Sequence, residues 1–197
     1  MPLLSSIQSV MEQHNGIISS AQANEFGISN ERLRLLVESG VLERVSFGVY
    51  SLPDEITDLM YVTQLRRPKI IYSHETALYL HDLTDRDPLR YSVTVPTGYN
   101  ATRLRKEYFN VYFIKRELHE IGITELTTIF NHKVKAYDLE RTLCDCIRNR
   151  NQMDISILTD AIKRYVKRKD KDLNALMKMA KMFRVDKPIR SYMEVLL

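Results

Sequence analysis

The sequence of 197 residues predicts an α+β protein: an N-terminal winged helix-turn-helix, followed by a mixed α/β C-terminal domain that ends in a helical bundle. Three observations indicate this fold. In residues 19–52, two short amphipathic segments joined by a glycine-containing turn precede a β-hairpin pattern. Segments 91–95 and 110–114 alternate and are rich in β-branched residues, and helical periodicity dominates from Asp138 onward. We therefore expect three regions: a winged domain at 1–52, a connecting helix or linker at 53–68, and a second domain at 69–197.

The N-terminal elements follow in order. A first helix is indicated by apolar residues at helical spacing, namely Leu3, Leu4, Ile7, Val10 and Met11. Ser19 and Ser29 each stand just before a helical pattern, where a hydroxyl can accept from unpaired backbone N–H groups. Gly27 can take positive φ in the turn, and Gly40 follows the end of the second helix. The hairpin is predicted at 41–45 and 49–52, around the turn Ser46-Phe47-Gly48.

The second helix of this unit is the predicted DNA reader, because a winged helix-turn-helix usually places it in the major groove. Its core side is indicated by the i, i+3, i+4 spacing of Leu33, Leu36 and Val37. The opposite face is then centred on Glu31, Leu35 and Glu38. We expect DNA contacts from seven residues of the helices and the hairpin: Ser19, Ser29, Asn30, Arg32, Arg34, Arg44 and Phe47.

The charge of this unit is unusual for a DNA-binding domain. Residues 1–52 contain three arginines and five glutamates, so a non-specific phosphate clamp is not expected. All three arginines nevertheless lie on the second helix or the hairpin, and an arginine can pair with guanine or enter a minor groove. The alternative is that the winged fold serves protein contact.

The second domain is predicted to begin as a small sheet backed by helices. An amphipathic helix at 56–65 connects to it, and a short helix capped by Ser73 and Thr76 follows the segment 69–72. A loop at 97–107 joins the strands at 91–95 and 110–114, and two further strands are expected at 124–130 and 133–137. Helices are then predicted at 139–148, capped by Asp138, at 155–166 and at 173–182, with a terminal segment at 189–197 after Pro188.

The strongest concentration of charge lies in this helical region. Between Lys163 and Arg190, eleven cationic residues face only three aspartates. Because apolar residues fill the inner faces, we expect the cations to form a basic surface able to neutralise several phosphates. The members that we assign to it are Lys163, Arg164, Lys167, Arg168, Lys169, Lys171, Lys178, Lys181 and Arg184. An acidic protein partner and a simple solvated face are the alternatives.

No pattern of catalysis or of cofactor binding is found. His74 and His81 share a helix face but lack a third ligand at metal-binding spacing, and no glycine-rich phosphate loop is present. We therefore expect no catalytic residue, no metal site and no cofactor. Arg141 and Asp145, at i, i+4, are expected to form an ion pair that fixes their helix to the sheet. The two cysteines, Cys144 and Cys146, are expected to be reduced thiols.

The chain is expected to be cytoplasmic. Its apolar stretches are shorter than the roughly 18 residues that cross a bilayer, and the N-terminus lacks the basic region of a signal peptide. We expect no membrane partner.

Three further motifs follow the winged unit: Ser-His-Glu-Thr-Ala-Leu at 73–78, Tyr-Ser-Val-Thr-Val-Pro at 91–96, and Tyr-Asp-Leu-Glu-Arg-Thr-Leu-Cys-Asp at 137–145. Their order and spacing resemble the AbiEi antitoxins of the AbiE abortive-infection, type IV toxin–antitoxin systems of bacteria. The resemblance spans nearly the whole chain. It implies a repressor that binds inverted repeats in its own operon promoter, and a C-terminal domain that counters a nucleotidyltransferase-like toxin without a stable complex.

Charge and resemblance together suggest a division of labour. The winged domain would give register on operator DNA, and the basic helical region would supply phosphate contacts and most of the affinity. We expect a monomer in solution that binds cooperatively on DNA. The alternative is a winged-helix protein- or RNA-interaction module that guards a toxin target through its basic C-terminal surface.

Overall fold

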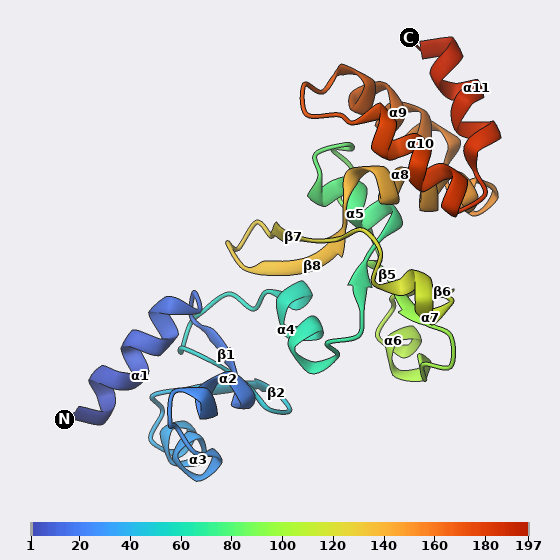
Figure 1. The fold of residues 1–197 in the computed structure, drawn as a ribbon. Helices are drawn as coiled ribbons and strands as arrows, with labels where there is room; N and C mark the ends of the chain where they lie inside the picture. Colours follow the sequence, from blue (N-terminus) through green and yellow to red (C-terminus); the bar gives the residue numbers. More distant parts are fainter. Residues whose placement is uncertain (1, 197) are drawn as a thin grey trace. The chain divides into compact units, whose positions relative to one another are not determined.

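The computed structural model describes the backbone of residues 2–196 and the side chains of residues 7–194. The protein is a mixed α+β structure, and its chain divides into two compact units (Figure 1). Unit 1 contains the chain up to Pro68 together with Thr127–Val134. Unit 2 contains Lys69–Leu126 and the chain from Lys135 onward. The division after Pro68 therefore does not separate the units completely, because the tip of a later hairpin belongs to unit 1.

Unit 1 combines four helices with a three-stranded antiparallel sheet of order β1-β3-β2. Its elements are α1 (Pro2–Gln13), β1 (Ile17–Ser19), α2 (Ser20–Glu25), α3 (Asn30–Glu38), β2 (Glu43–Ser46), β3 (Val49–Ser51) and α4 (Leu59–Arg66). Two predicted helix starts are correct, because the Ser19 and Ser29 hydroxyls accept from the backbone N–H groups of Gln22 and Arg32. Strand β1 was not predicted from the sequence.

The core of unit 1 packs α1, α2 and α3 against the sheet. Ile7, Met11 and Leu33 are buried in this cluster, whereas the side chains of Leu3 and Leu4 lie outside the described residues. A second cluster joins Val62 of α4 to Ile17 and Val49 of β1 and β3. Segment 53–68 is therefore not a free connection, because its helix buries apolar surface within unit 1.

Helix α4 corrects the prediction of a helix over 56–65. Asp58 caps it by accepting from the Tyr61 N–H, so the helix begins at Leu59. Ile56 lies outside the helix and is 66% exposed. Its apolar side chain matched the helical period, but a capping carboxylate two residues later determines where the first turn begins.

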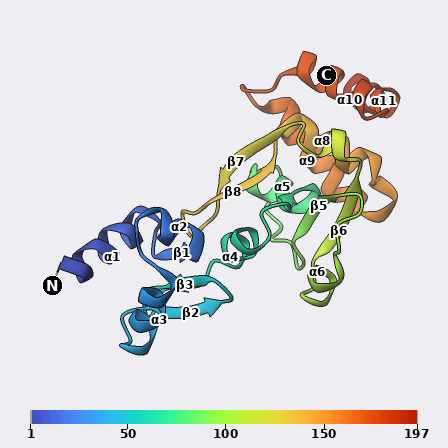
Figure 2. The same ribbon diagram turned by 60° about the horizontal axis from the view of Figure 1, so that its bottom comes forward.

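Unit 2 is built on a five-stranded mixed sheet of order β6-β5-β4-β8-β7 (Figure 2). Strands β5 and β6 are parallel, β4 and β5 are antiparallel, and β4 and β8 are parallel. The elements of this part are β4 (Ile71–Tyr72), α5 (His74–Leu80), β5 (Ser92–Pro96), α6 (Thr102–Lys106), β6 (Asn110–Ile114), α7 (Arg116–His119), β7 (Ile123–Thr127) and β8 (Lys133–Tyr137). The segment 97–107, predicted as a loop, contains α6, and β7 ends before 128–130 because those residues form the hairpin tip.

The helical part of unit 2 follows the sheet. Its elements are α8 (Leu139–Arg148), a 3-10 turn η1 (Arg150–Gln152), α9 (Ile155–Lys167), α10 (Leu173–Met182) and α11 (Asp186–Leu196). The large apolar cluster of unit 2 includes Leu78, Leu143, Ile162 and Leu176, so α8 joins α5 to the later helices. The terminal segment expected after Pro188 is helical from Asp186, because proline is tolerated in the first turn of a helix.

Candidate nucleic-acid interface

Helix α3 exposes the face that the sequence analysis assigned to DNA. Leu33 is fully buried and Leu36 and Val37 are half-buried, whereas Leu35 is 50% exposed. The core side and the outer side of this helix are therefore as predicted. At its start, Ser29 and Asn30 are exposed.

One arginine beside this face, Arg34, is already paired. Arg34 contacts a Glu31 carboxylate oxygen at 2.6 Å through Nη2, and its Nη1 also donates to Glu38. These carboxylates raise the pKa of Arg34 and, through the hydrogen bond from Arg34, lower the pKa of Glu31. All three side chains are more than half exposed, so water screens the pairs. A phosphate or a base edge would have to compete with both carboxylates for Arg34.

Two other arginines have no such competition. Arg32 is exposed and makes no side-chain hydrogen bond or ion pair with any described residue. Arg44 lies 5.3 Å from the centre of the Phe47 ring on the β2–β3 hairpin, and Phe47 is 81% exposed. The hairpin thus presents a cation and an aromatic ring together, a pair suited to a groove edge or a stacked base.

Ser19 has a different environment from the other predicted DNA contacts. It is 8% exposed, and its N–H and hydroxyl both engage the side chain of Gln22 at 2.9 Å and 2.8 Å. The Gln22 amide in turn donates to the Tyr61 hydroxyl at 3.2 Å. Ser19 therefore caps α2. Its hydroxyl donates to Gln22 and has no second hydrogen to donate to a phosphate.

The basic helical surface contains two kinds of cation. Six members are exposed and make no ion pair with a described residue: Lys163, Lys167, Lys169, Lys178, Lys181 and Arg184. Three others are half-buried and serve the fold. Arg164 donates to Asp85 at 2.9 Å, Arg168 pairs with Asp170 and donates to the carbonyl of His81, and Lys171 donates to the carbonyl of Arg168. The expectation that all nine project freely outward is therefore wrong for these three.

His74, Cys144 and Cys146 are buried in the interior of unit 2. His74 stacks on Tyr112 at 3.5 Å between ring centres, with Ser73 and Asn149 at its two nitrogens. Burial, assisted by Arg141 and Arg148, lowers the pKa of His74 to about 3. Cys144 and Cys146 are free and buried, and burial raises both of their pKa values. Within residues 7–194, no group of three or more His, Cys, Asp or Glu could hold a metal ion.

A buried polar cluster in unit 1 was missed by the sequence analysis. Asp58 accepts from the Thr128 hydroxyl at 2.6 Å and from His132 Nδ1 at 3.0 Å, and His132 Nε2 lies 3.2 Å from the carbonyl oxygen of Asn15. Asp58 and His132 are 2% and 3% exposed. Burial alone would raise the pKa of Asp58, but these hydrogen bonds outweigh it and hold the pKa below its ordinary value. The cluster attaches the tip of the β7–β8 hairpin inside unit 1.

No helix within residues 2–196 has the length and apolarity to cross a membrane.

Comparison with known proteins confirms the family resemblance over the winged region. Residues 7–53 match the family model described as transcriptional regulator, AbiEi antitoxin. The family is described as one of transcriptional regulators and antitoxins, so the match supports a regulatory antitoxin role. No curated protein matches the chain. A solved structure, the RV2827C protein from Mycobacterium tuberculosis, is similar with a TM-score of 0.55 and 13% identity over 92% of this chain and 72% of that chain. This likeness concerns the fold alone.

Proposed function

We propose that this chain is the antitoxin of a bacterial type IV toxin–antitoxin system and the DNA-binding autorepressor of its own operon. The observation that carries the proposal is the match of residues 7–53 to AbiEi regulators, since this segment contains α3 and the β2–β3 hairpin. On this proposal the protein acts in the cytoplasm, binds inverted repeats in its promoter, and opposes a nucleotidyltransferase-like toxin without a stable complex. A monomer in solution would bind the repeats cooperatively.

The two units would contribute differently to DNA binding. Unit 1 would set the register through Asn30, Arg32, Arg44 and Phe47, whose side chains are exposed. Arg32 and Arg44 alone cannot neutralise many phosphates. The exposed lysines of α9, α10 and α11 would therefore supply most of the salt-dependent affinity.

Full-length variants test this division better than a fragment of residues 1–67. Unit 1 includes Thr127–Val134, so such a fragment would leave Asp58 buried without Thr128 and His132. We expect Lys178→Gln/Lys181→Gln/Lys187→Gln to weaken binding to the promoter and to scrambled DNA by the same factor. The slope of log K against log salt should fall by about 0.9 for each phosphate that the variant no longer neutralises.

Arg32→Gln is the matched comparison. We expect it to reduce affinity for the promoter by about 1–3 kcal/mol while binding to scrambled DNA changes little, because base contacts carry specificity. Fluorescence anisotropy over a range of salt concentrations measures both quantities. A uniform loss for Arg32→Gln, or an unchanged slope for the triple lysine variant, would contradict the division of labour.

The carboxylates on α3 provide a separate prediction. Glu31→Gln/Glu38→Gln frees Arg34 and removes two negative charges from the proposed DNA-facing helix. We expect promoter affinity to rise about tenfold, with a salt slope steeper by about 1. The control is Glu12→Gln/Glu25→Gln, which makes the same charge change on α1 and α2. Equal gains in both variants would show that α3 does not face DNA.

A second candidate function is a protein- or RNA-interaction module that guards the toxin target through the basic surface. The neutralised Arg34 and the exposed Leu35 and Phe47 favour it, because such a surface suits protein contact. Tighter binding of RNA than of promoter DNA, together with toxin protection that survives Arg32→Gln, would support this candidate. Protection itself is measured as growth during co-expression with a nucleotidyltransferase-like toxin.

A further inference from the structure

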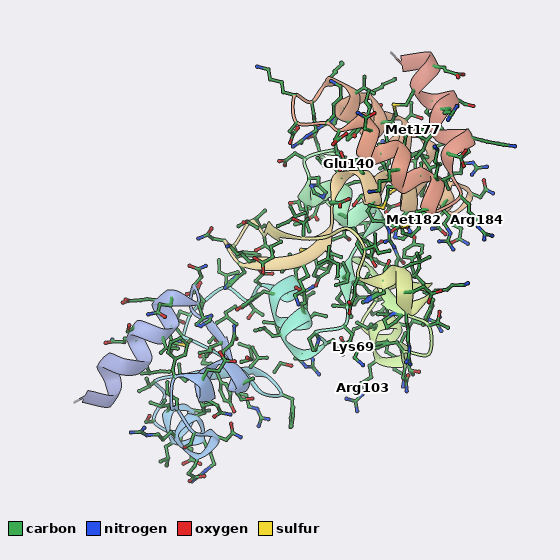
Figure 3. All side chains as sticks on the ribbon, in the orientation of Figure 1. Lys69, Arg103, Glu140, Met177, Met182 and Arg184 are labelled. Carbon is green, nitrogen blue, oxygen red and sulfur yellow. The ribbon has the colours of Figure 1, made fainter. Side chains whose placement is uncertain are left out.

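Unit 2 contains a groove that shares only Arg184 with the basic helical surface. It has a volume of about 700 Å³ and is lined by residues of β6, α7, α8, η1 and the segment joining α10 to α11. Met182 and Arg184 lie close together at the end of α10 (Figure 3). Small-molecule sites typically fall in this range of volume and draw their walls from several elements.

The rim of the groove is cationic. Among the described residues, the lining includes one carboxylate, that of Glu117, and four cationic side chains: Lys115, Arg148, Arg150 and Arg184. Lys115 lies 3.8 Å from that carboxylate, so the three arginines remain in excess. Neither Arg148 nor Arg184 makes a side-chain hydrogen bond or ion pair with a described residue, and both are exposed. Unpaired guanidinium groups at one hollow are suited to a multiply charged anion, because each can form two parallel hydrogen bonds to phosphate.

Part of the groove wall consists of apolar side chains. Phe113 is 42% exposed and Met182 is 43% exposed, and Val185 and Pro188 complete this side. The guanidinium of Arg105 lies over the Phe113 ring, 5.5 Å from its centre, so the free face of that ring and the thioether of Met182 are the surfaces on which a planar ring can pack. An inorganic anion would gain nothing from these side chains. The combination instead suits a ligand with a planar apolar part and a highly charged part.

A smaller polar chamber of about 190 Å³ continues from the groove, because Phe113, Ile114 and Arg148 line both. His74, Thr94 and Asn149 also line it. The Asn149 amide nitrogen lies 3.0 Å from His74 Nε2 and donates to the carbonyl of Asp145, which leaves its oxygen without a partner among the described residues. This oxygen can accept a hydrogen bond from the edge of a base.

We propose that this groove binds a free nucleoside triphosphate, with its phosphates at Arg148, Arg150 and Arg184 and its base between the apolar wall and the polar chamber. A mononucleotide fits better than a nucleic-acid strand, since the cations and the aromatic ring converge on one hollow instead of following a track. The site would make the protein responsive to nucleotide concentration. It goes beyond the proposed function and does not depend on it.

Calorimetric titration of the full chain with ATP and with GTP tests the proposal. We expect saturable 1:1 binding and a ligand-dependent rise in Tm. Arg148→Gln/Arg184→Gln should weaken binding at least about tenfold, because each guanidinium removed would have made charge-assisted hydrogen bonds to phosphate. The control is Arg103→Gln/Lys106→Gln on α6, which removes two exposed cations outside the groove; Figure 3 labels Arg103 and Arg184. Unliganded Tm and circular dichroism verify that both variants fold.

Two further probes separate the possible sources of binding. Tripolyphosphate that binds as tightly as ATP and GTP would overturn the proposal, since the base would then contribute nothing. A single-stranded oligonucleotide that binds where neither mononucleotide does would also overturn it, as would equal losses in the two variants. Nucleotide binding with unchanged or absent promoter binding would support the site and count only against the proposed function.

Discussion

Replacing Arg141 with leucine is expected to lower the free energy of unfolding of unit 2 by about 3–5 kcal/mol. Arg141 is fully buried, and its Nε donates to Asp145 Oδ2 at 2.9 Å. Its Nη1 donates to the carbonyls of Leu118 and Ile121 at 2.9 Å and 2.8 Å, which joins α8 to the segment before β7. The ion pair predicted from the i, i+4 spacing is therefore confirmed.

The guanidinium group of Arg141 also lies between two aromatic rings. It is 4.0 Å from the ring centre of Tyr137 and 3.9 Å from that of Phe183, at the ends of β8 and α10. A cation in this position adds an electrostatic attraction to each ring that leucine cannot replace. The substitution would thus weaken contacts to the sheet and to the helices at once.

The size of the loss should depend on pH. Burial raises the pKa of Asp145 to about 6, and Arg141 opposes that rise. Without Arg141 the pKa would be higher still. A carboxyl whose pKa is higher in the folded state loses stability as pH rises from its unfolded pKa to its folded pKa. We therefore expect Arg141→Leu to be more destabilising at pH 8 than at pH 5.

Urea unfolding followed by circular dichroism, with hydrogen exchange of α8 peptides, measures this effect. The control is the double variant Arg141→Leu/Asp145→Leu, which removes both charges. We expect it to be more stable than Arg141→Leu at pH 8, because no unpaired carboxylate remains buried. If the single and double variants unfold at the same urea concentration at both pH values, the ion pair does not determine the stability of unit 2.

Local chemistry explains which elements could be predicted from the sequence. The caps at Ser29 and Asp138 depend on hydrogen bonds three residues away, so the residues that decide them are close neighbours in the chain. Ser73 occupies the predicted N-cap position of α5, but the predicted capping hydrogen bond is not formed, for the opposite reason. Its hydroxyl accepts from Thr94 and contacts His74, and it makes no capping hydrogen bond. The Ser73 hydroxyl therefore takes part in a tertiary hydrogen bond with Thr94 instead of capping the helix.

The missed parts of the candidate sites all depend on distant partners. Strand β1 has only three residues and forms because β3 pairs with it. The groove in unit 2 collects Lys115, Arg148 and Arg184 from separate elements, and no periodicity connects them. Likewise, Asp58 and His132 are 74 positions apart. Sequence patterns report helix faces and caps well, whereas convergence of such residues follows only from the topology of the sheets.

Loss of the buried contact between Asp58 and His132 is expected to lower the stability of unit 1 strongly. Both ring nitrogens of His132 face oxygen atoms, of the Asp58 carboxylate and of the Asn15 carbonyl. The ring also stacks on Tyr61 at 4.3 Å between ring centres. We expect His132→Ala to destabilise unit 1 by about 3–5 kcal/mol, because it leaves the Asp58 carboxylate buried without this partner.

The loss of stability should be confined to unit 1, and acid should have an effect in the same direction. Loss of His132 should raise hydrogen exchange in Thr127–Val134 and at the start of α4, while unit 2 peptides keep their protection. Hydrogen bonds hold the pKa of Asp58 below its value in the unfolded chain. The contribution of Asp58 to folding stability is therefore complete above the unfolded pKa of about 3.9, and it is lost as the pH falls through the lower folded pKa. Acid should therefore loosen the wild-type segment as well.

A double-mutant cycle separates the ion pair from general damage to the hairpin tip. Asp58→Asn alone should be destabilising, and adding it to His132→Ala should cost much less than the sum of the two losses, because each variant already breaks the same interaction. Ile129→Ala changes a 77% exposed side chain of the same tip and should alter stability by less than about 0.5 kcal/mol. Additive losses in the cycle would mean that Asp58 and His132 act independently, and the tip would then be attached by the Thr128 and Asn15 hydrogen bonds instead.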